Sequence, residues 1–177
     1  MAKDRLSHLD ETGRARMVDV SGKPPTVRRA VAAGRVRVSP ALAAAIAANT
    51  LAKGDLLAVA RLAGIQAAKR TDELIPLCHS LPLDHVDVQA RLEGSVIHLQ
   101  AEATTTWKTG VEMEALTAVA VAALTVIDMG KAIDKSITIE EIRLIEKTGG
   151  KSGEVRDQKS EVRGQRGDPG PGSVQSL

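Results

Sequence analysis

The chain has 177 residues, of which 26% are charged and 43% hydrophobic, and its formal net charge at pH 7 is +2. This composition is typical of a globular protein, and the balanced charge argues against a protein that coats nucleic acid without sequence preference. The chain has no Phe or Tyr and one Trp, so it lacks the aromatic platform on which single-stranded nucleic acids stack, and its single Cys excludes a disulfide framework and a multi-cysteine zinc site.

The polar and apolar segments predict one folded domain between two flexible ends. Residues 151–177 are rich in charged residues and poor in large apolar ones, so they cannot bury enough surface to offset the entropy of ordering. We therefore predict a folded domain at residues 10–150, with flexible segments at 1–9 and 151–177. We see no apolar run as long as a membrane span and no secretory apolar region at the charged start, and so expect a cytoplasmic protein without membrane contact.

The first half of the domain predicts strands followed by helices. Met17–Val20 indicates a short strand, and the alternation of Arg35–Val38 indicates a second one. Ser39–Pro40 is typical of a helix start, because serine caps the first turn and proline suits its first position. Lys53–Asp55 ends this helix and begins another, which we expect to reach residue 70.

The second half predicts a loop, a hairpin, a helix and a strand. The loop at 74–83 is apolar and holds two prolines, and residues 86–103 alternate about a turn at Glu93–Gly94, which indicates a hairpin. A long helix is expected at 111–133 and a last strand at 137–146.

The order of these elements is that of the β-α-β-β-α-β unit of ferredoxin-like proteins. We therefore predict an α+β fold in which an antiparallel sheet is covered by helices on one face, with the strand at Met17–Val20 as an addition. Because one fold supports many functions, the function must be inferred from particular side chains.

The long helix carries charges at both ends of an apolar middle. Glu112 and Glu114 lie near its start, and Asp128 and Lys131 near its end. These charges are either the solvated ends of a core helix or functional groups, and the pattern alone favours neither. Glu114 and Asp128 are separated by roughly 21 Å of helix, so they cannot serve one small ligand within one copy. If both are functional, we hypothesise that an isologous dimer, in which this helix packs against a neighbour, brings them together.

Other polar residues have a structural and a functional interpretation. Lys53 lies in a turn between helices, which by itself favours a structural turn. Cys78 and His79 are adjacent in sequence and point different ways, so they form a poor nucleophile–base pair. A packed cysteine and a hydrogen-bonding histidine are the simpler interpretation, and no metal site is predicted.

Several long stretches together resemble one family, the MoaC proteins of molybdenum cofactor biosynthesis. The matching stretches are Met17–Ser21 with Thr26–Arg28, KGDLLAVARLAGIQAAKRT at 53–71, LIPLCHSLPL at 74–83, KTGVEMEALTAVAVAALTVIDMGKA at 108–132 and EKTGGKSG at 146–153. They cover nearly the whole predicted domain, and their unusual charged strings are far more specific than a glycine motif.

The resemblance implies a ferredoxin-like cytoplasmic lyase, a cyclic pyranopterin monophosphate synthase. Such an enzyme converts 3′,8-cyclo-7,8-dihydro-GTP, a cyclised GTP derivative, into cyclic pyranopterin monophosphate and releases pyrophosphate. The family is described as a homohexamer, built as a trimer of dimers with its sites at the dimer interface. No cofactor is required by the sequence, although Mg²⁺ on the phosphates is an open possibility.

Carried over position by position, the resemblance implies two groups of site residues. The catalytic residues are Asp128, Lys131 and Lys53. The substrate-binding residues are Leu77, Cys78, His79, Met113, Glu114, Glu112, Arg28, Lys69 and Lys147. Two positions depart from the family pattern: Ser80 stands where a proline is expected, and Gly130 replaces a bulkier residue.

Two other functions remain open at this level. A non-catalytic ferredoxin-like module, a ligand sensor or an assembly subunit, would use the charges of the long helix as ion pairs in an oligomer interface. Nucleic-acid binding is disfavoured by the balanced charge and the missing aromatic residues.

Overall fold

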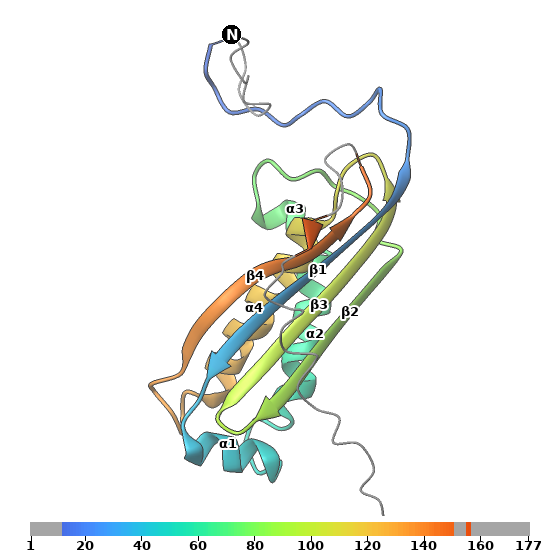
Figure 1. The fold of residues 1–177 in the computed structure, drawn as a ribbon. Coiled ribbons are helices and arrows are strands. Elements are labelled where there is room, and N and C mark those ends of the chain that lie inside the picture. The colour runs from blue at the N-terminus through green and yellow to red at the C-terminus, as the bar shows by residue number, and fades with distance from the viewer. Residues whose placement is uncertain (1–11, 151–154, 157–177) are drawn as a thin grey trace, which may run out of the picture.

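The computed structural model describes residues 12–150 and 155–156 of the chain. The elements, in order, are β1 (Thr26–Arg37), α1 (Pro40–Ala47), α2 (Leu56–Ala68), α3 (Thr71–Leu74), β2 (His85–Glu93), β3 (Val96–Trp107), α4 (Glu112–Gly130), β4 (Thr138–Thr148) and β5 (Val155–Arg156). The strands form one open antiparallel sheet in the order β2-β3-β1-β4-β5, and α2 and α4 lie against one of its faces (Figure 1). The fold is therefore α+β, as predicted.

Strand β1 is the centre of the sheet. It pairs with β3 along its whole length, from Thr26 opposite Trp107 to Arg37 opposite Val96. On its other side it pairs with β4, with register shifts between Val31 and Ala32 and between Arg35 and Val36. The predicted strand at 35–38 is thus only the end of a strand that begins at Thr26.

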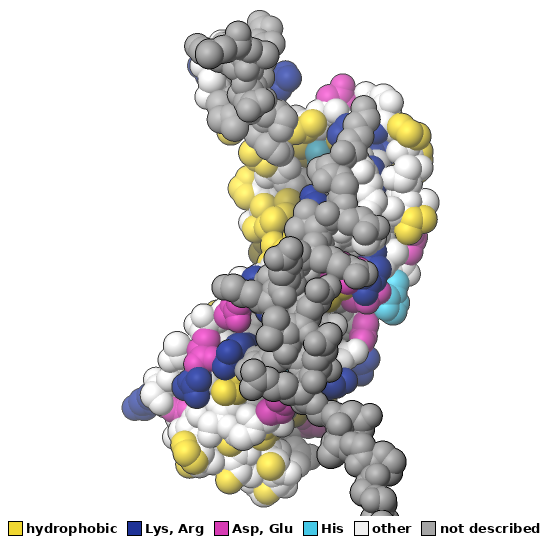
Figure 2. Space-filling view, in the orientation of Figure 1, with side chains coloured by type: hydrophobic (Ala, Val, Ile, Leu, Met, Phe, Trp, Pro, Cys, Tyr) yellow, Lys and Arg dark blue, Asp and Glu magenta, His cyan; other side chains and the backbone are white. Residues whose placement is uncertain are grey.

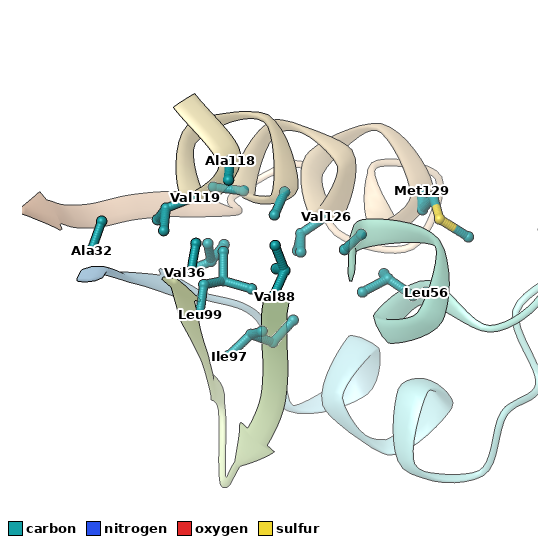
Figure 3. Packing of buried hydrophobic residues seen from close by; sticks show 14 of the residues in the cluster. Ala32, Val36, Leu56, Val88, Ile97, Leu99, Ala118, Val119, Val126 and Met129 are labelled. Carbon is teal, nitrogen blue, oxygen red and sulfur yellow. The ribbon is translucent and has the colours of Figure 1, made fainter. Parts of the chain in front are cut away.

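Alternate residues of the strands face the helices and form the core. Val36 on β1, Val88 on β2 and Leu99 on β3 lie under Val119 and Val126 of α4 (Figure 3). Gly34 allows the closest approach, because a Cβ atom there would lie 2.5 Å from Cγ1 of Val119. The apolar middle of α4 is buried because the helix packs on this surface.

The opposite face of the sheet is charged. The guanidinium of Arg29 donates to Glu102 at 2.7 Å and to Glu146 at 2.6 Å, and Arg37 donates to Glu140 at 2.5 Å. Acidic and basic side chains alternate where this face is visible (Figure 2). Such partly exposed pairs contribute little to stability, so the helix-facing side holds the sheet together.

Both predicted helix starts are confirmed. The hydroxyl of Ser39 accepts a hydrogen bond from the Leu42 amide at 3.2 Å, and Pro40 occupies the first turn of α1. The carboxylate of Asp55 accepts from the Ala58 amide at 3.0 Å and caps α2. These side chains satisfy amides that the first turn leaves without partners.

The extra strand predicted at Met17–Val20 is not formed, since these residues are in no strand. Instead, Nε2 of His79 donates to the carbonyl oxygen of Val18 at 2.7 Å. The segment therefore lies along the loop after α3. The apolar loop and the hairpin were predicted, but the short helix α3 was not.

Helix α4 corrects the expectation that no segment is as long and apolar as a membrane span. Its 19 residues are long and apolar enough to cross a membrane, by length and composition alone. Ten of its residues, from Glu114 to Gly130, are buried in the fold. We interpret α4 as the core helix of the domain.

The two segments predicted to be flexible lie mostly outside the described residues. Only 155 and 156 of the predicted tail are described, and they form β5 opposite Glu146 and Lys147 on β4. This pairing was not expected from the polar composition.

Candidate active site

Nine of the twelve residues expected to be functional form two groups at opposite ends of α4. The first group, here called the lysine–aspartate cluster, consists of Lys53, Asp128 and Lys131. The second group lines a cleft beside the first turn of α4. The last turn of α4 lies towards α1, and its first turn lies towards α3 and the end of β4 (Figure 1).

In the lysine–aspartate cluster one carboxylate holds two ammonium groups. Nζ of Lys53 lies 2.9 Å from Oδ2 of Asp128 and 2.9 Å from its carbonyl oxygen. Nζ of Lys131 lies 2.6 Å from Oδ1 of the same carboxylate. These hydrogen bonds, first from Lys131 and then from Lys53, lower the pKa of Asp128 to about 2. The carboxylate is therefore ionised at any physiological pH and acts as an acceptor.

Local sequence explains how the cluster forms. Lys131 follows Asp128 by one turn at the end of α4, so both side chains share one face. Lys53 lies in the turn before α2, where Gly54 has a φ of +88° that other residues rarely adopt. The turn is thus structural and also brings Lys53 to Asp128. The three side chains are 49%, 59% and 62% exposed for Lys53, Asp128 and Lys131, so nothing in one copy covers them.

The cleft has a volume of about 510 Å³ and brings together three segments that are distant in sequence. Residues before β1, the loop after α3 and the start of α4 all contribute to its wall. Six residues carried over from the family lie there, namely Leu77, Cys78, His79, Glu112, Met113 and Glu114. The cleft therefore contains most of the predicted substrate-binding residues.

Burial sets the protonation of two groups in the cleft. Glu114 is only 4% exposed, and burial, helped by the negative charges of Glu112 and Asp72, raises its pKa to about 7. Burial also raises the pKa of the Cys78 thiol, and the charge of Glu114 acts in the same direction. Cys78 is thus poorly suited to be a nucleophile, as the sequence indicated. Glu114, in contrast, can both donate and accept a proton near neutral pH.

The raised pKa of Glu114 predicts a stability effect. Between its ordinary pKa of 4.5 and about 7, the folded state holds a proton that the unfolded state has lost, so the free energy of unfolding falls as pH rises through this range. We expect Glu114→Gln to raise the free energy of unfolding by about 3 kcal/mol at pH 8 and by little near pH 4.5. Urea denaturation at both pH values, with the exposed Glu73→Gln as control, measures this. An equal effect at both pH values would contradict it.

Three predicted cations lie in different surroundings. Nζ of Lys147 lies 2.9 Å from Oε1 of Glu112 and ties β4 to the first turn of α4, next to the cleft. Arg28 lies on β1 and borders a second, smaller cavity rather than the cleft. Lys69 is exposed at the end of α2 and does not line the cleft.

The sequence interpretation missed several residues of the cleft wall. Val18, Val20 and Lys23 line it, although Met17–Val20 was predicted to be a strand. For Val18 and Val20 the signal was present, because Met17–Ser21 is one of the stretches that resemble the family; Lys23 lies outside these stretches. Leu81, in the apolar loop, also lines the cleft.

The two departures from the family pattern are accommodated by packing. The hydroxyl of Ser80 donates to the carboxylate of Asp72, which tethers the loop where a proline was expected. Gly130 is buried, and a Cβ atom there would lie 2.6 Å from Cδ2 of Leu42 and 2.9 Å from Cδ1 of Ile137. These two side chains fill the space of the bulkier residue.

Among residues 12–150, no group of three or more His, Cys, Asp or Glu side chains is arranged to hold a metal ion.

Comparison with known proteins shows the family to which this site belongs. The sequence model of the MoaC family matches residues 17–150, which contain both the lysine–aspartate cluster and the cleft. The chain belongs to the MoaC family. A relative from Thermomicrobium roseum is 58% identical over 160 residues, or 89% of this chain and 96% of the relative. One from Roseiflexus sp. is 60% identical over 151 residues, or 84% and 96%.

A third MoaC relative, from Nostoc sp., is 58% identical over 151 residues, which cover 84% of this chain and 90% of the relative. All three relatives are named cyclic pyranopterin monophosphate synthase. The likeness extends over nearly their whole length.

Proposed function

We propose that this MoaC protein is a cyclic pyranopterin monophosphate synthase, a lyase of molybdenum cofactor biosynthesis. The observation that carries the proposal is the carboxylate of Asp128 between Lys53 and Lys131, in a chain whose relatives bear this name. The substrate is 3′,8-cyclo-7,8-dihydro-GTP, and the products are cyclic pyranopterin monophosphate and pyrophosphate.

The reaction needs repeated proton transfers. The five-membered ring of the purine opens and its atoms close again as a pterin, so protons must be added to and removed from nitrogen and carbon atoms. Lys131 and Lys53, held by the ionised carboxylate of Asp128, supply and accept these protons. Glu114, with a pKa of about 7, and His79 hold the guanine-derived nitrogens in the cleft.

The cyclic phosphate forms by displacement at phosphorus. A sugar hydroxyl attacks the α-phosphorus, and its proton passes to a base. The bond between the α-phosphorus and the oxygen bridging to the β-phosphate breaks, and pyrophosphate leaves with the bonding electrons. Cationic side chains near the outer phosphates, Arg28, Lys69 and Lys147, stabilise this leaving group. Mg²⁺ would enter as a counter-ion of these phosphates, and the chemistry requires no resident cofactor.

The site is completed by a second copy of the chain. The lysine–aspartate cluster and the cleft lie at opposite ends of a 19-residue helix, so they are too far apart to act on one substrate molecule within one copy. The exposure of Asp128 and both lysines supports a cover provided by a partner. We propose a dimer in which each cleft faces the partner's cluster, and a cytoplasmic hexamer built from three such dimers.

We further propose that the fold is ferredoxin-like. The strand order β2-β3-β1-β4, with α2 and α4 on one face, supports this assignment. In this arrangement α4 crosses the sheet from one site region to the other.

The first test is to incubate the purified full chain with the cyclised GTP derivative and to measure pyrophosphate release and the pterin product. We expect stoichiometric release of both. A folded oligomer that releases no pyrophosphate would overturn the proposal and favour the non-catalytic sensor or assembly subunit.

A further inference from the structure

One wall of the cleft is a segment that belongs to no helix or strand. Residues 17–21 precede β1, and Val18 contributes to the wall. A single hydrogen bond ties this segment to each of the other two walls. Towards the loop after α3, Nε2 of His79 bonds the carbonyl oxygen of Val18 at 2.7 Å. Towards the start of α4, Nζ of Lys108 donates to the carbonyl oxygen of Ser21 at 3.0 Å.

The bond to Val18 determines which nitrogen of His79 carries the proton. A carbonyl oxygen only accepts hydrogen bonds, so Nε2 is the donor. In a neutral imidazole Nδ1 is then the nitrogen without a proton, and it can only accept. No other described group is hydrogen-bonded to the ring, which lines the cleft, so Nδ1 is the acceptor that His79 has for a ligand there.

Lys108 supports the same segment from the other side. It directly follows β3, its side chain is partly buried, and the next two residues line the cleft. Within the segment, the carboxylate of Asp19 accepts a hydrogen bond from the Ser21 amide at 2.8 Å. Hydrogen bonds from Ser21, and then the positive charge of Lys108, lower the pKa of Asp19. Lys108 therefore stabilises the turn through a hydrogen bond and through its charge.

We propose that Lys108 is a positioning residue, which holds residues 17–21 in the cleft wall so that the Val18 carbonyl keeps His79 protonated at Nε2 and its Nδ1 accepts an N–H group of the substrate. The inference rests on the proposed function, in which His79 contacts the guanine-derived nitrogens. The exocyclic amino group of guanine is a donor of this kind. His79 is thus an acceptor rather than a donor, and Lys108 acts without contact with the substrate.

The first test observes His79 directly, by long-range ¹H–¹⁵N NMR of the full chain with labelled histidine, without ligand and at a pH where the imidazole is neutral. We expect only the form protonated at Nε2, with a proton that exchanges slowly with water because it is hydrogen-bonded. The signal is assigned by its loss in His79→Ala. Protonation of the wild-type ring at Nδ1 would overturn the proposal.

Variants of Lys108 show whether this arrangement depends on its ammonium group. Lys108→Met keeps the apolar stem, and it should speed exchange of the Nε2 proton by about tenfold or more, as is typical for loss of a hydrogen bond from a charged group. Lys108→Arg keeps a donor and should retain slow exchange. The matched control is Lys135→Met, at an exposed lysine before β4, which should behave as the wild type does. An exchange rate that Lys108→Met leaves unchanged would contradict the positioning role.

The kinetic test is a double-mutant cycle with the cyclised GTP derivative. Lys108→Met should lower kcat/KM by about tenfold in the wild-type background and have little further effect in a His79→Ala background, because Lys108 acts through His79. A lysine that contacts the substrate itself would cost the same in both backgrounds, and that result would refute the proposal. Thermal unfolding of each variant verifies that the compared proteins are folded.

The NMR measurement separates this inference from the proposed function. If the wild type converts the cyclised GTP derivative but the Nε2 proton does not depend on Lys108, the function stands and the positioning role is wrong. If the proton depends on Lys108 but the wild type has no activity, Lys108 still positions His79 and the proposed function fails.

Discussion

Replacing Asp128 with alanine is expected to reduce turnover by about a thousandfold or more and to leave the protein folded, as is replacing Lys53. Loss of a positioned proton-transfer group typically costs 10²–10⁴ in rate. Asp128→Ala should be the more severe change, because its carboxylate accepts hydrogen bonds from both Lys53 and Lys131 and holds them together.

The small effect on stability follows from exposure. The side chain of Asp128 is 59% exposed and that of Lys53 is 49% exposed. Ion pairs between exposed groups contribute little to the free energy of folding. The lowered pKa of Asp128 means that its ion pairs are present above its ordinary pKa of 3.8 and are lost only as pH falls to about 2. Near neutral pH, the titration of Asp128 should therefore not change the free energy of unfolding.

The measurement is pyrophosphate release at saturating substrate, together with thermal unfolding and the size of the oligomer. Asp87→Asn is a matched control, because Asp87 also accepts from an exposed cation, Arg61, at 3.1 Å on another part of the surface. It should retain full turnover. If Asp128→Ala unfolds or dissociates instead of losing turnover, the cluster is a structural ion pair of the assembly and the catalytic role is wrong.

Mixing two inactive variants is expected to restore activity. His79→Ala damages the cleft and Asp128→Ala damages the lysine–aspartate cluster, so a dimer of one variant with the other has one intact site and one doubly damaged site. Random exchange makes half of the dimers mixed, and each has one of two sites intact, which predicts about a quarter of the wild-type activity. The physical reason is the length of α4, which separates the two groups within one copy.

The experiment exchanges subunits by mild denaturation and refolding of the two variants together, and it measures turnover against each variant treated alone. A mixture of Lys53→Ala with Asp128→Ala serves as the control, because both changes lie in the same cluster and no intact site can form. Activity that stays at the level of the separate variants after verified exchange would show that each site lies within one chain, and would contradict the proposed dimer.

Much of the local structure could be predicted because its causes are local. Ser39 and Asp55 cap the amides of their own helices. The alternation of residues on both sides of Gly94 predicts the hairpin of β2 and β3, which are neighbours in sequence. The failures have tertiary causes. The strand expected at Met17–Val20 is absent, and the carbonyl of Val18 accepts a hydrogen bond from His79, about sixty residues away. Strand β1 was predicted too short because its run of small residues, Ala30 to Gly34, gains its stability from two neighbouring strands.

The candidate site, too, could be predicted only in part. From sequence alone, the stretches shared with the MoaC family identify Lys53, Asp128 and Lys131 and the residues of the cleft, and the length of one helix separates them into two groups. Only the tertiary structure decides that Asp128 lies between both lysines and that Glu114 is buried with a pKa of about 7. It also decides that Lys23, Arg28 and Gly150 line one cavity. These properties depend on distances and on burial between segments far apart in the chain, which the order of residues along one segment does not specify.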